Sequence, residues 1–257
     1  MLYMKTKFDK IYVVSLITNK DRQEFIKYQF DELGLDFEFI YGIDYYNFNN
    51  IEWPDVYINT INNCKGDGKD FGCAMTHYQA VMQAYHLGYN NVLIFEDDVC
   101  MNKDKHMIED MLNNIPEDAD YIDYDPRQYL ESYQQQLLKI INNINSRYFK
   151  INKIFYGAAM FGIMNRKTMK LYLDSQHNCL KMSDNVDNFV ENKTIQNYYI
   201  STKCLFVAQH TLNKIFNKKN YSFAHCYDNM YLRSNKYKKE DFFEPKIYHE
   251  WSRDNII

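Results

Sequence analysis

No stretch of the sequence approaches the run of about 18 apolar residues that a membrane-spanning helix needs. An apolar signal-peptide core is missing as well, because Met1-Leu2-Tyr3 is followed at once by Lys5 and Lys7. The six cysteines form no Cys-x-x-Cys pair, so the usual zinc-site spacing is absent. We therefore expect a cytoplasmic protein whose thiols are reduced and buried.

Net charge is also small: 30 basic and 34 acidic residues leave −4, which gives no electrostatic argument for nucleic-acid binding. Two local basic runs, Lys218-Lys219 and Lys236-Tyr237-Lys238-Lys239, are interpreted as solvated surface. Peripheral contact with a membrane or with an acidic acceptor is the alternative for these runs.

Apolar material is plentiful, at 46% hydrophobic and 17% aromatic residues, which is enough to build a buried core. A chain of 257 residues favours one elaborated domain over two. We assign residues 1–212 to that domain. The polar, aromatic segment 213–257 is expected to be a C-terminal extension that packs on it.

Strand-like and helix-like segments alternate along the chain, which predicts an α/β fold with a mostly parallel sheet. A strand at 11–16, a helix that stops at Gly34 and a strand at 37–41 open the chain, and an irregular excursion at 45–70 follows. We next expect a helix at 73–87 and a strand at 91–95. Further segments are helices near 103–115 and 128–145 and at 168–173, and strands at 121–124, 158–164 and 203–208.

Three adjacent carboxylates, Glu96-Asp97-Asp98, directly follow the predicted strand 91–95. In open α/β sheets, ligands bind outside the carboxyl ends of the strands. Bunched carboxylates repel one another unless a cation neutralises them, and Mg²⁺ or Mn²⁺ prefers such oxygen ligands together with substrate phosphates. The alternative is that these acids only end a strand and cap the next helix. Asp123 and Asp125 end another predicted strand. They could face the same crevice, but we favour a solvated strand end, with Pro126 starting a turn.

Several further motifs follow one another along the chain. They are Ile11–Leu16, Asp21-Arg22, Phe37–Asp44, Gly72-Cys73-Ala74-Met75-Thr76-His77, Ile94–Val99, Tyr156–Met160 with Asn165-Arg166-Lys167, Asn185-Val186-Asp187 and Phe206–Gln209. Their order and spacing resemble glycosyltransferase family 25, which includes lipooligosaccharide and collagen β-galactosyltransferases. Thr76 stands where the family usually has Ser, and Asn185 stands where a Pro often precedes the Val-Asp pair.

The resemblance implies a GT-A-type, Rossmann-like sandwich in which Glu96-Asp97-Asp98 takes the place of the Asp-x-Asp motif. Asp98 would bind Mn²⁺ or Mg²⁺, Glu96 would lie nearer the ribose, and Asp97 would be a second metal ligand or a supporting group. His225 is the candidate third ligand, although no motif selects it over His210 or His249.

Donor-binding candidates follow from the same resemblance: Val14, Ser15, Leu16, Arg22 and His77. The alternative for Arg22 is an ion pair with a nearby acid, and the alternative for His77 is a structural hydrogen bond. Cys73 is interpreted as a buried structural thiol. Asp187 is the candidate catalytic base, with Asp184 as its nearest substitute, and the alternative is that both are surface acids.

The resemblance implies an inverting transfer of a hexose, galactose or glucose, from a UDP-sugar to a hydroxyl of a glycan or protein, as in lipopolysaccharide biosynthesis. A catalytically inactive sugar-nucleotide-binding scaffold is the main alternative. A nucleotidyltransferase is disfavoured, because residues 16–22 contain no glycine to form a phosphate-binding loop.

Overall fold

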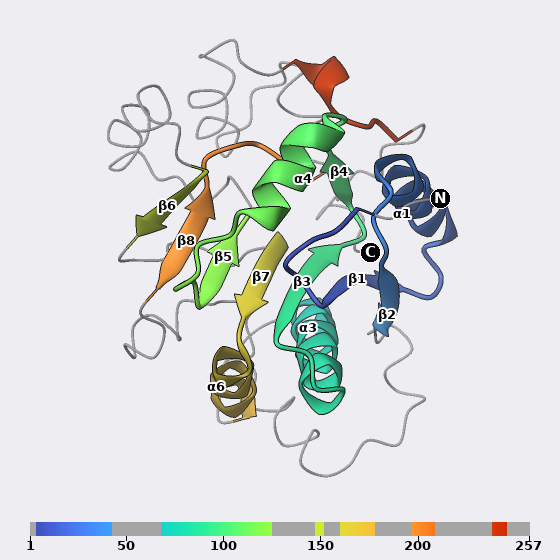
Figure 1. The fold of residues 1–257 in the computed structure, drawn as a ribbon. Helices are drawn as coiled ribbons and strands as arrows, with labels where there is room; N and C mark the ends of the chain where they lie inside the picture. The colour runs from blue at the N-terminus through green and yellow to red at the C-terminus, as the bar shows by residue number, and fades with distance from the viewer. Residues whose placement is uncertain are drawn as a thin grey trace, which may run out of the picture.

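The protein is described here by a computed structural model that covers residues 4–42, 68–124, 147–151, 160–177, 197–208 and 238–245. The strands of its main sheet are β1 (Lys10–Leu16), β2 (Glu38–Gly42), β3 (Asn91–Glu96), β5 (Tyr121–Asp123), β6 (Tyr148–Ile151), β7 (Met160–Met164) and β8 (Tyr198–Ser201). They form a seven-stranded sheet in the order β2-β1-β3-β7-β5-β8-β6 (Figure 1). Only β7 and β6 run against the other strands, so the sheet is mostly parallel, as the sequence predicted.

Helices pack on both faces of this sheet. They are α1 (Lys20–Leu33), α3 (Gly68–His86), α4 (Lys105–Asn113) and α6 (Arg166–His177). None of the described helices combines the length and the apolar character that a membrane span requires.

Alternating side chains of the central strands divide the core into two layers. Tyr12 of β1 and Ile94 of β3 belong to the cluster that contains residues of α3 and α6. Their neighbours Val13 and Phe95 belong to the cluster that contains residues of α1 and α4. The fold is therefore an α/β/α sandwich, and the predicted fold class is confirmed (Figure 1).

Local sequence explains where the helices begin and end. Gly34 ends α1 with φ 70°, a left-handed conformation that glycine adopts without a Cβ clash. The Asp104 side chain accepts a hydrogen bond from the Met107 backbone N–H and so caps α4. Asn165 caps α6 in the same way, because its Oδ1 accepts from the Thr168 N–H.

The strand expected at 203–208 differs from the prediction. Only β9 (Phe206–Ala208) forms, and it pairs with β4 (Val99–Met101) in a separate two-stranded sheet instead of joining the main sheet. The sequence also missed β4, β6 and β8, since strands of three or four residues carry little periodic signal. Helix α3 begins at Gly68, earlier than expected. The predicted helix 128–145 and most of the excursion 45–70 lie outside the described residues.

Part of the expected C-terminal extension packs beside β4. Phe242 forms a β-bridge with Asn102, and Phe242 and Phe243 are both buried. The backbone N–H of Lys103 donates to the carbonyl of Asp241, the last residue of the 3-10 helix η4 (Lys239–Asp241). The boundary between the predicted domain and its extension remains a prediction.

Candidate functional site

The carboxyl ends of β1 and β3 lie side by side, because β1 and β3 pair in parallel with Val14 opposite Glu96. Asp97 and Asp98 form the turn that leads from β3 into β4. This edge is where open α/β sheets bind their ligands. The fold thus brings the predicted residues at the end of β1 next to the three adjacent acids.

Asp97 ties the two strand ends together. Its Oδ2 accepts hydrogen bonds from Ser15 Oγ at 2.7 Å and from Asn19 Nδ2 at 3.0 Å. Its Oδ1 accepts from Arg22 Nη1 at 2.8 Å, in an ion pair that leaves the Asp97 side chain only 8% exposed. Arg22 therefore compensates the charge of Asp97, and the repulsion that argued for a cation applies less to this acid. Arg22 thus forms an ion pair with a nearby acid, as the alternative prediction stated, and that acid is Asp97 of the acidic motif.

Two buried glutamines of α1, which the sequence analysis missed, support this arrangement. Gln23 Nε2 donates to the Leu16 carbonyl at 2.7 Å and to Ser15 Oγ at 3.3 Å. Gln29 Nε2 donates to the Val99 carbonyl, while its Oε1 accepts from the Met101 N–H, so it holds both ends of β4. The sequence could have indicated that both glutamines are buried, because their spacing from the apolar residues of α1 puts them on the same face of the helix.

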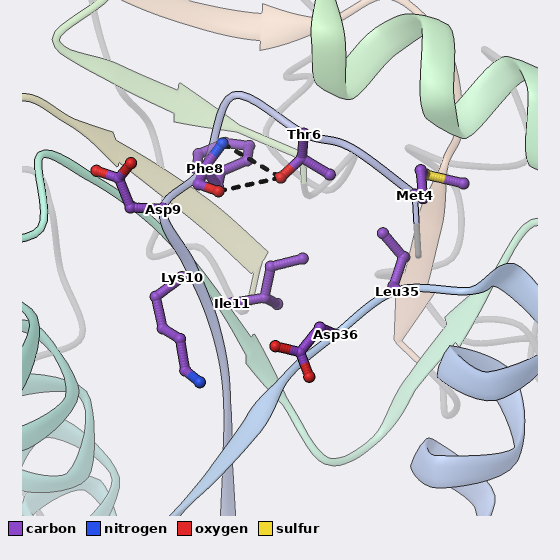
Figure 2. Close-up of a pocket in the computed structure, with 8 residues that line it drawn as sticks. All are labelled: Met4, Thr6, Phe8, Asp9, Lys10, Ile11, Leu35 and Asp36. Carbon is purple, nitrogen blue, oxygen red and sulfur yellow. Dashed lines mark hydrogen bonds between the residues drawn. The ribbon is translucent and has the colours of Figure 1, made fainter. Parts of the chain in front are cut away.

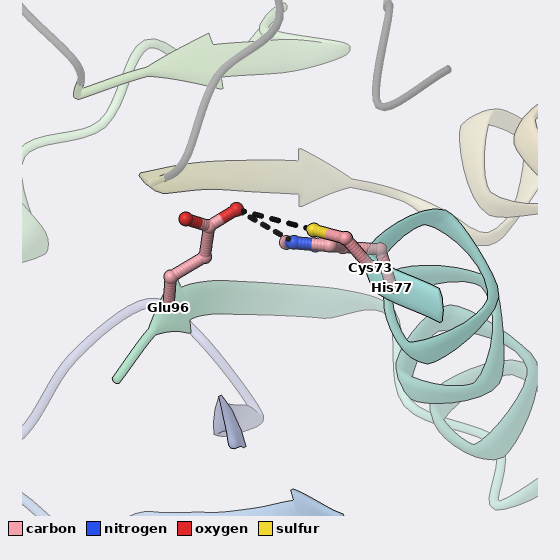
Figure 3. A group of neighbouring side chains, drawn as sticks. All are labelled: Cys73, His77 and Glu96. Atoms are coloured by element: carbon pink, nitrogen blue, oxygen red, sulfur yellow. Dashed lines mark hydrogen bonds and ion pairs between the residues drawn. The ribbon is translucent and has the colours of Figure 1, made fainter. Parts of the chain in front are cut away.

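Glu96 is held from the other side, by α3. Its Oε1 lies 3.2 Å from His77 Nε2 and 3.6 Å from Cys73 Sγ, and Figure 3 shows both side chains reaching one oxygen. His77 is 1% exposed, whereas the Glu96 side chain is 28% exposed. Cys73 is partly exposed, so the expectation that its thiol is buried is wrong. The structure therefore places His77 against the acidic motif, as its motif block implied.

Asp98 lies in the turn after β3 and is buried, at 8% exposed. Burial raises the pKa of the nearby Cys100 thiol well above its ordinary value, and the negative charge of Asp98 raises it further. Both effects disfavour the thiolate form of Cys100.

The family is decided by comparison with known proteins. A family model described as glycosyltransferase family 25 (LPS biosynthesis protein) matches residues 8–203. The chain belongs to glycosyltransferase family 25. A search of curated proteins gave no match. Among solved structures, the family 25 chain is similar to one titled "Crystal structure of a glycosyltransferase involved in the glycosylation of the major capsid of PBCV-1", with 10% sequence identity, a TM-score of 0.43, and coverage of 87% of this chain and 98% of that chain.

Asp123 of this family 25 chain is not at a solvated strand end, so that expectation is wrong. It is 1% exposed and accepts a hydrogen bond from the Tyr198 hydroxyl at 2.8 Å. The reason is topological, because β5 lies inside the sheet between β7 and β8. Asp125 lies outside the described residues.

Several predicted site residues of the family 25 chain also lie outside the described residues. They are the candidate base Asp187, its substitute Asp184 and the candidate metal ligand His225, together with His210 and His249. Their roles remain predictions.

A small pocket of about 140 Å³ lies at the opposite end of β1, where the strand begins (Figure 2). Asp9 and Lys10 line it, and both have partners: Asp9 accepts from the N–H groups of Asn90 and Asn91, and Lys10 pairs with Glu38 at 3.0 Å. These contacts show that Asp9 and Lys10 hold β1 against its neighbouring strands. The pocket lies at the other end of β1 from the acidic motif.

Proposed function

We propose that the chain is an inverting, GT-A-type glycosyltransferase that moves galactose or glucose from a UDP-sugar to an acceptor hydroxyl on a glycan or protein. The observation that carries the proposal is the Asp97 network, in which Ser15, Asn19 and Arg22 join the ends of β1 and β3. These hydrogen bonds hold the backbone and side chains rigidly at the edge of the sheet where ligands bind. The chain belongs to a family of glycosyltransferases.

In this proposal the nucleotide lies over the end of β1, against Val14, Ser15 and Leu16. Glu96 takes the ribose side, because its partly exposed carboxylate directs a second oxygen away from Cys73 and His77 (Figure 3). The diphosphate lies on the Asp98 side of the turn.

The residues of the turn fit a hard divalent cation, Mn²⁺ or Mg²⁺, because carboxylate oxygens are the ligands that such ions take. Asp98 is assigned as the main ligand, with His225 as a further candidate ligand. Asp97 is assigned as the supporting group, since Arg22 already pairs with it. When bound, the ion supplies Lewis-acid stabilisation of the leaving diphosphate.

Asp187 is proposed to accept the proton of the acceptor hydroxyl, on the face of the sugar opposite the diphosphate. Inversion needs one such base, because the transfer is a single displacement at the anomeric carbon. Asp184 is the nearest substitute for that role.

The proposal is tested by a screen for donor hydrolysis over a set of nucleotide sugars with Mn²⁺ present. Release of UDP from UDP-galactose or UDP-glucose, lost in Asp98→Asn, is the expected result. Hydrolysis of a sugar linked to another nucleotide would overturn the assignment of UDP as the carrier. Tight binding of UDP-sugars without any turnover, in the presence of candidate acceptors, would favour the inactive scaffold instead.

A further inference from the structure

Three different metal-ligating side chains converge beside the crevice. Cys73 and His77 are four residues apart on α3, so they lie one turn apart on the same face of the helix. Glu96 meets them from the end of β3 (Figure 3). One sulfur, one nitrogen and one oxygen atom from these residues all lie within 4.8 Å of one another.

Two separations within this group agree with the edges of a zinc coordination tetrahedron. Bonds of about 2.3 Å to sulfur and about 2.0 to 2.1 Å to nitrogen and oxygen, at tetrahedral angles, put S···O at about 3.5 Å and N···O at about 3.3 Å. The distances in the protein are 3.6 Å from Cys73 Sγ to Glu96 Oε1 and 3.2 Å from His77 Nε2 to the same oxygen. The third separation, between the sulfur and the nitrogen, is within 4.8 Å, so the three atoms are close enough for one ion to bind all of them.

We propose that Cys73 Sγ, His77 Nε2 and Glu96 Oε1 bind one Zn²⁺. A thiolate and an imidazole suit this borderline-soft ion and not the hard ions Mg²⁺ and Mn²⁺. His77 at 1% exposed forms the inner wall of the site, while the 28% exposed Glu96 side chain opens it toward the crevice. Three protein ligands leave a fourth position for water, the pattern of zinc sites that are not closed structural ones.

The proposed zinc site and the proposed donor site use different atoms of the acidic motif. Oε1 of Glu96 faces the two side chains of α3, and the other carboxylate oxygen points away from them (Figure 3). Asp97 is held on the α1 side by Arg22. Zinc binding thus depends on Cys73, His77 and Glu96 and not on Asp98, so a change at Asp98 tests the proposed transfer without removing a zinc ligand.

The competing explanation is a hydrogen-bonded cluster without metal, in which the thiol and the imidazole only orient the Glu96 carboxylate. Zn²⁺ and Co²⁺ titrations of the chelator-treated full chain, without nucleotide, separate the two. We expect one Zn²⁺ per chain by elemental analysis after desalting. With Co²⁺, we expect visible bands of a tetrahedral site together with a thiolate-to-cobalt charge-transfer band.

Cys73→Ala should abolish the charge-transfer band and weaken zinc binding by at least about 100-fold, since loss of even an outer-shell partner costs 10- to 100-fold. Cys204→Ala is the matched control, because Cys204 is another cysteine of the described residues, is buried at 4% exposed and is not part of the cluster of Cys73, His77 and Glu96. It should bind as the wild type does. Thermal melting without metal shows whether each variant is folded.

Asp98→Asn should retain the zinc, which separates this proposal from the one for transfer. A wild-type chain that binds no stoichiometric Zn²⁺, or a Co²⁺ complex without a thiolate band, would overturn the zinc site and leave the proposed transfer untouched. Equal zinc affinity of folded Cys73→Ala and wild type would overturn it as well.

Discussion

Glu96 and Asp97 are consecutive in the chain, yet helices on opposite faces of the central sheet hold their carboxylates. His77 of α3 lies 3.2 Å from Glu96 Oε1, and Arg22 of α1 lies 2.8 Å from Asp97 Oδ1. The alternation of side chains along β3 explains this split, since Ile94 faces α3 and Phe95 faces α1. The three adjacent acids are thus separate groups with separate partners, and each can be tested alone.

Binding of UDP should depend on Mn²⁺ or Mg²⁺. The diphosphate and the carboxylate of Asp98 repel each other until a cation bridges them. Calorimetry with and without EDTA measures this effect, with Mn²⁺ and Zn²⁺ added back separately so that the proposed zinc site is not confused with it. Equal UDP affinity with and without EDTA would exclude the metal-bridged donor site.

Asp98→Asn should remove most of the metal dependence together with the activity, while the fold stays intact. We expect an unchanged or higher melting temperature, because the substitution removes one of several nearby negative charges. Differential scanning calorimetry and donor hydrolysis on the same preparation check both parts. A clearly lower melting temperature would show that Asp98 has a structural role instead.

Arg22→Met should lower the free energy of unfolding by about 3 kcal/mol, because it leaves the carboxylate of Asp97 buried without its ion-pair partner. The double variant Arg22→Met/Asp97→Asn should recover part of this loss, since it removes the buried charge. Urea denaturation measures both. Arg147→Met is the matched control: its ion pair with Asp110 is exposed, at 43% and 47%, and its loss should matter far less. Equal effects at the two arginines would contradict a special role for the Asp97 network.

Asp187→Asn should leave the binding of UDP and Mn²⁺ nearly unchanged and reduce transfer by on the order of 10²- to 10⁴-fold, the usual contribution of a positioned general base. Steady-state transfer rates and calorimetry on the same variant measure the two effects. Asp184→Asn is the control and should retain activity. An Asp187→Asn variant with more than about a third of the wild-type rate would rule out the assignment.

Gly162→Ala should destabilise the protein by about 1 to 3 kcal/mol through overpacking in the sheet. A Cβ at this position of β7 would lie 2.7 Å from two ring atoms of Phe8, which is buried at 6% exposed. In a Phe8→Leu background the same glycine substitution should cost less, because the ring atoms are gone. Urea denaturation of the four proteins gives the coupling between the two sites. Independent, additive effects would show that the ring moves aside freely.

Much of the fold could be predicted because its signals are local. The apolar runs of β1 and β3 are buried as expected, and Gly34 ends α1 with the positive φ that its position suggested. The carboxyl edge of the sheet was also predictable, since the acids directly follow a buried strand. The family match over residues 8–203 confirmed the predicted family.

The partners within the site depend on the tertiary structure alone. Asp97 meets Arg22 and Ser15 across 75 and 82 positions of the chain, and Glu96 meets Cys73 across 23. No local pattern encodes which face of the sheet each acid joins. The pair Cys73 and His77 has no Cys-x-x-Cys spacing, and the glutamate that meets it is 23 positions from Cys73 in the chain. Sequence determined that acids end a central strand in a family 25 chain. Only the packing of α1 and α3 on opposite faces decided that the carboxylate of Asp97 pairs with an arginine and that the carboxylate of Glu96 meets a thiol and an imidazole.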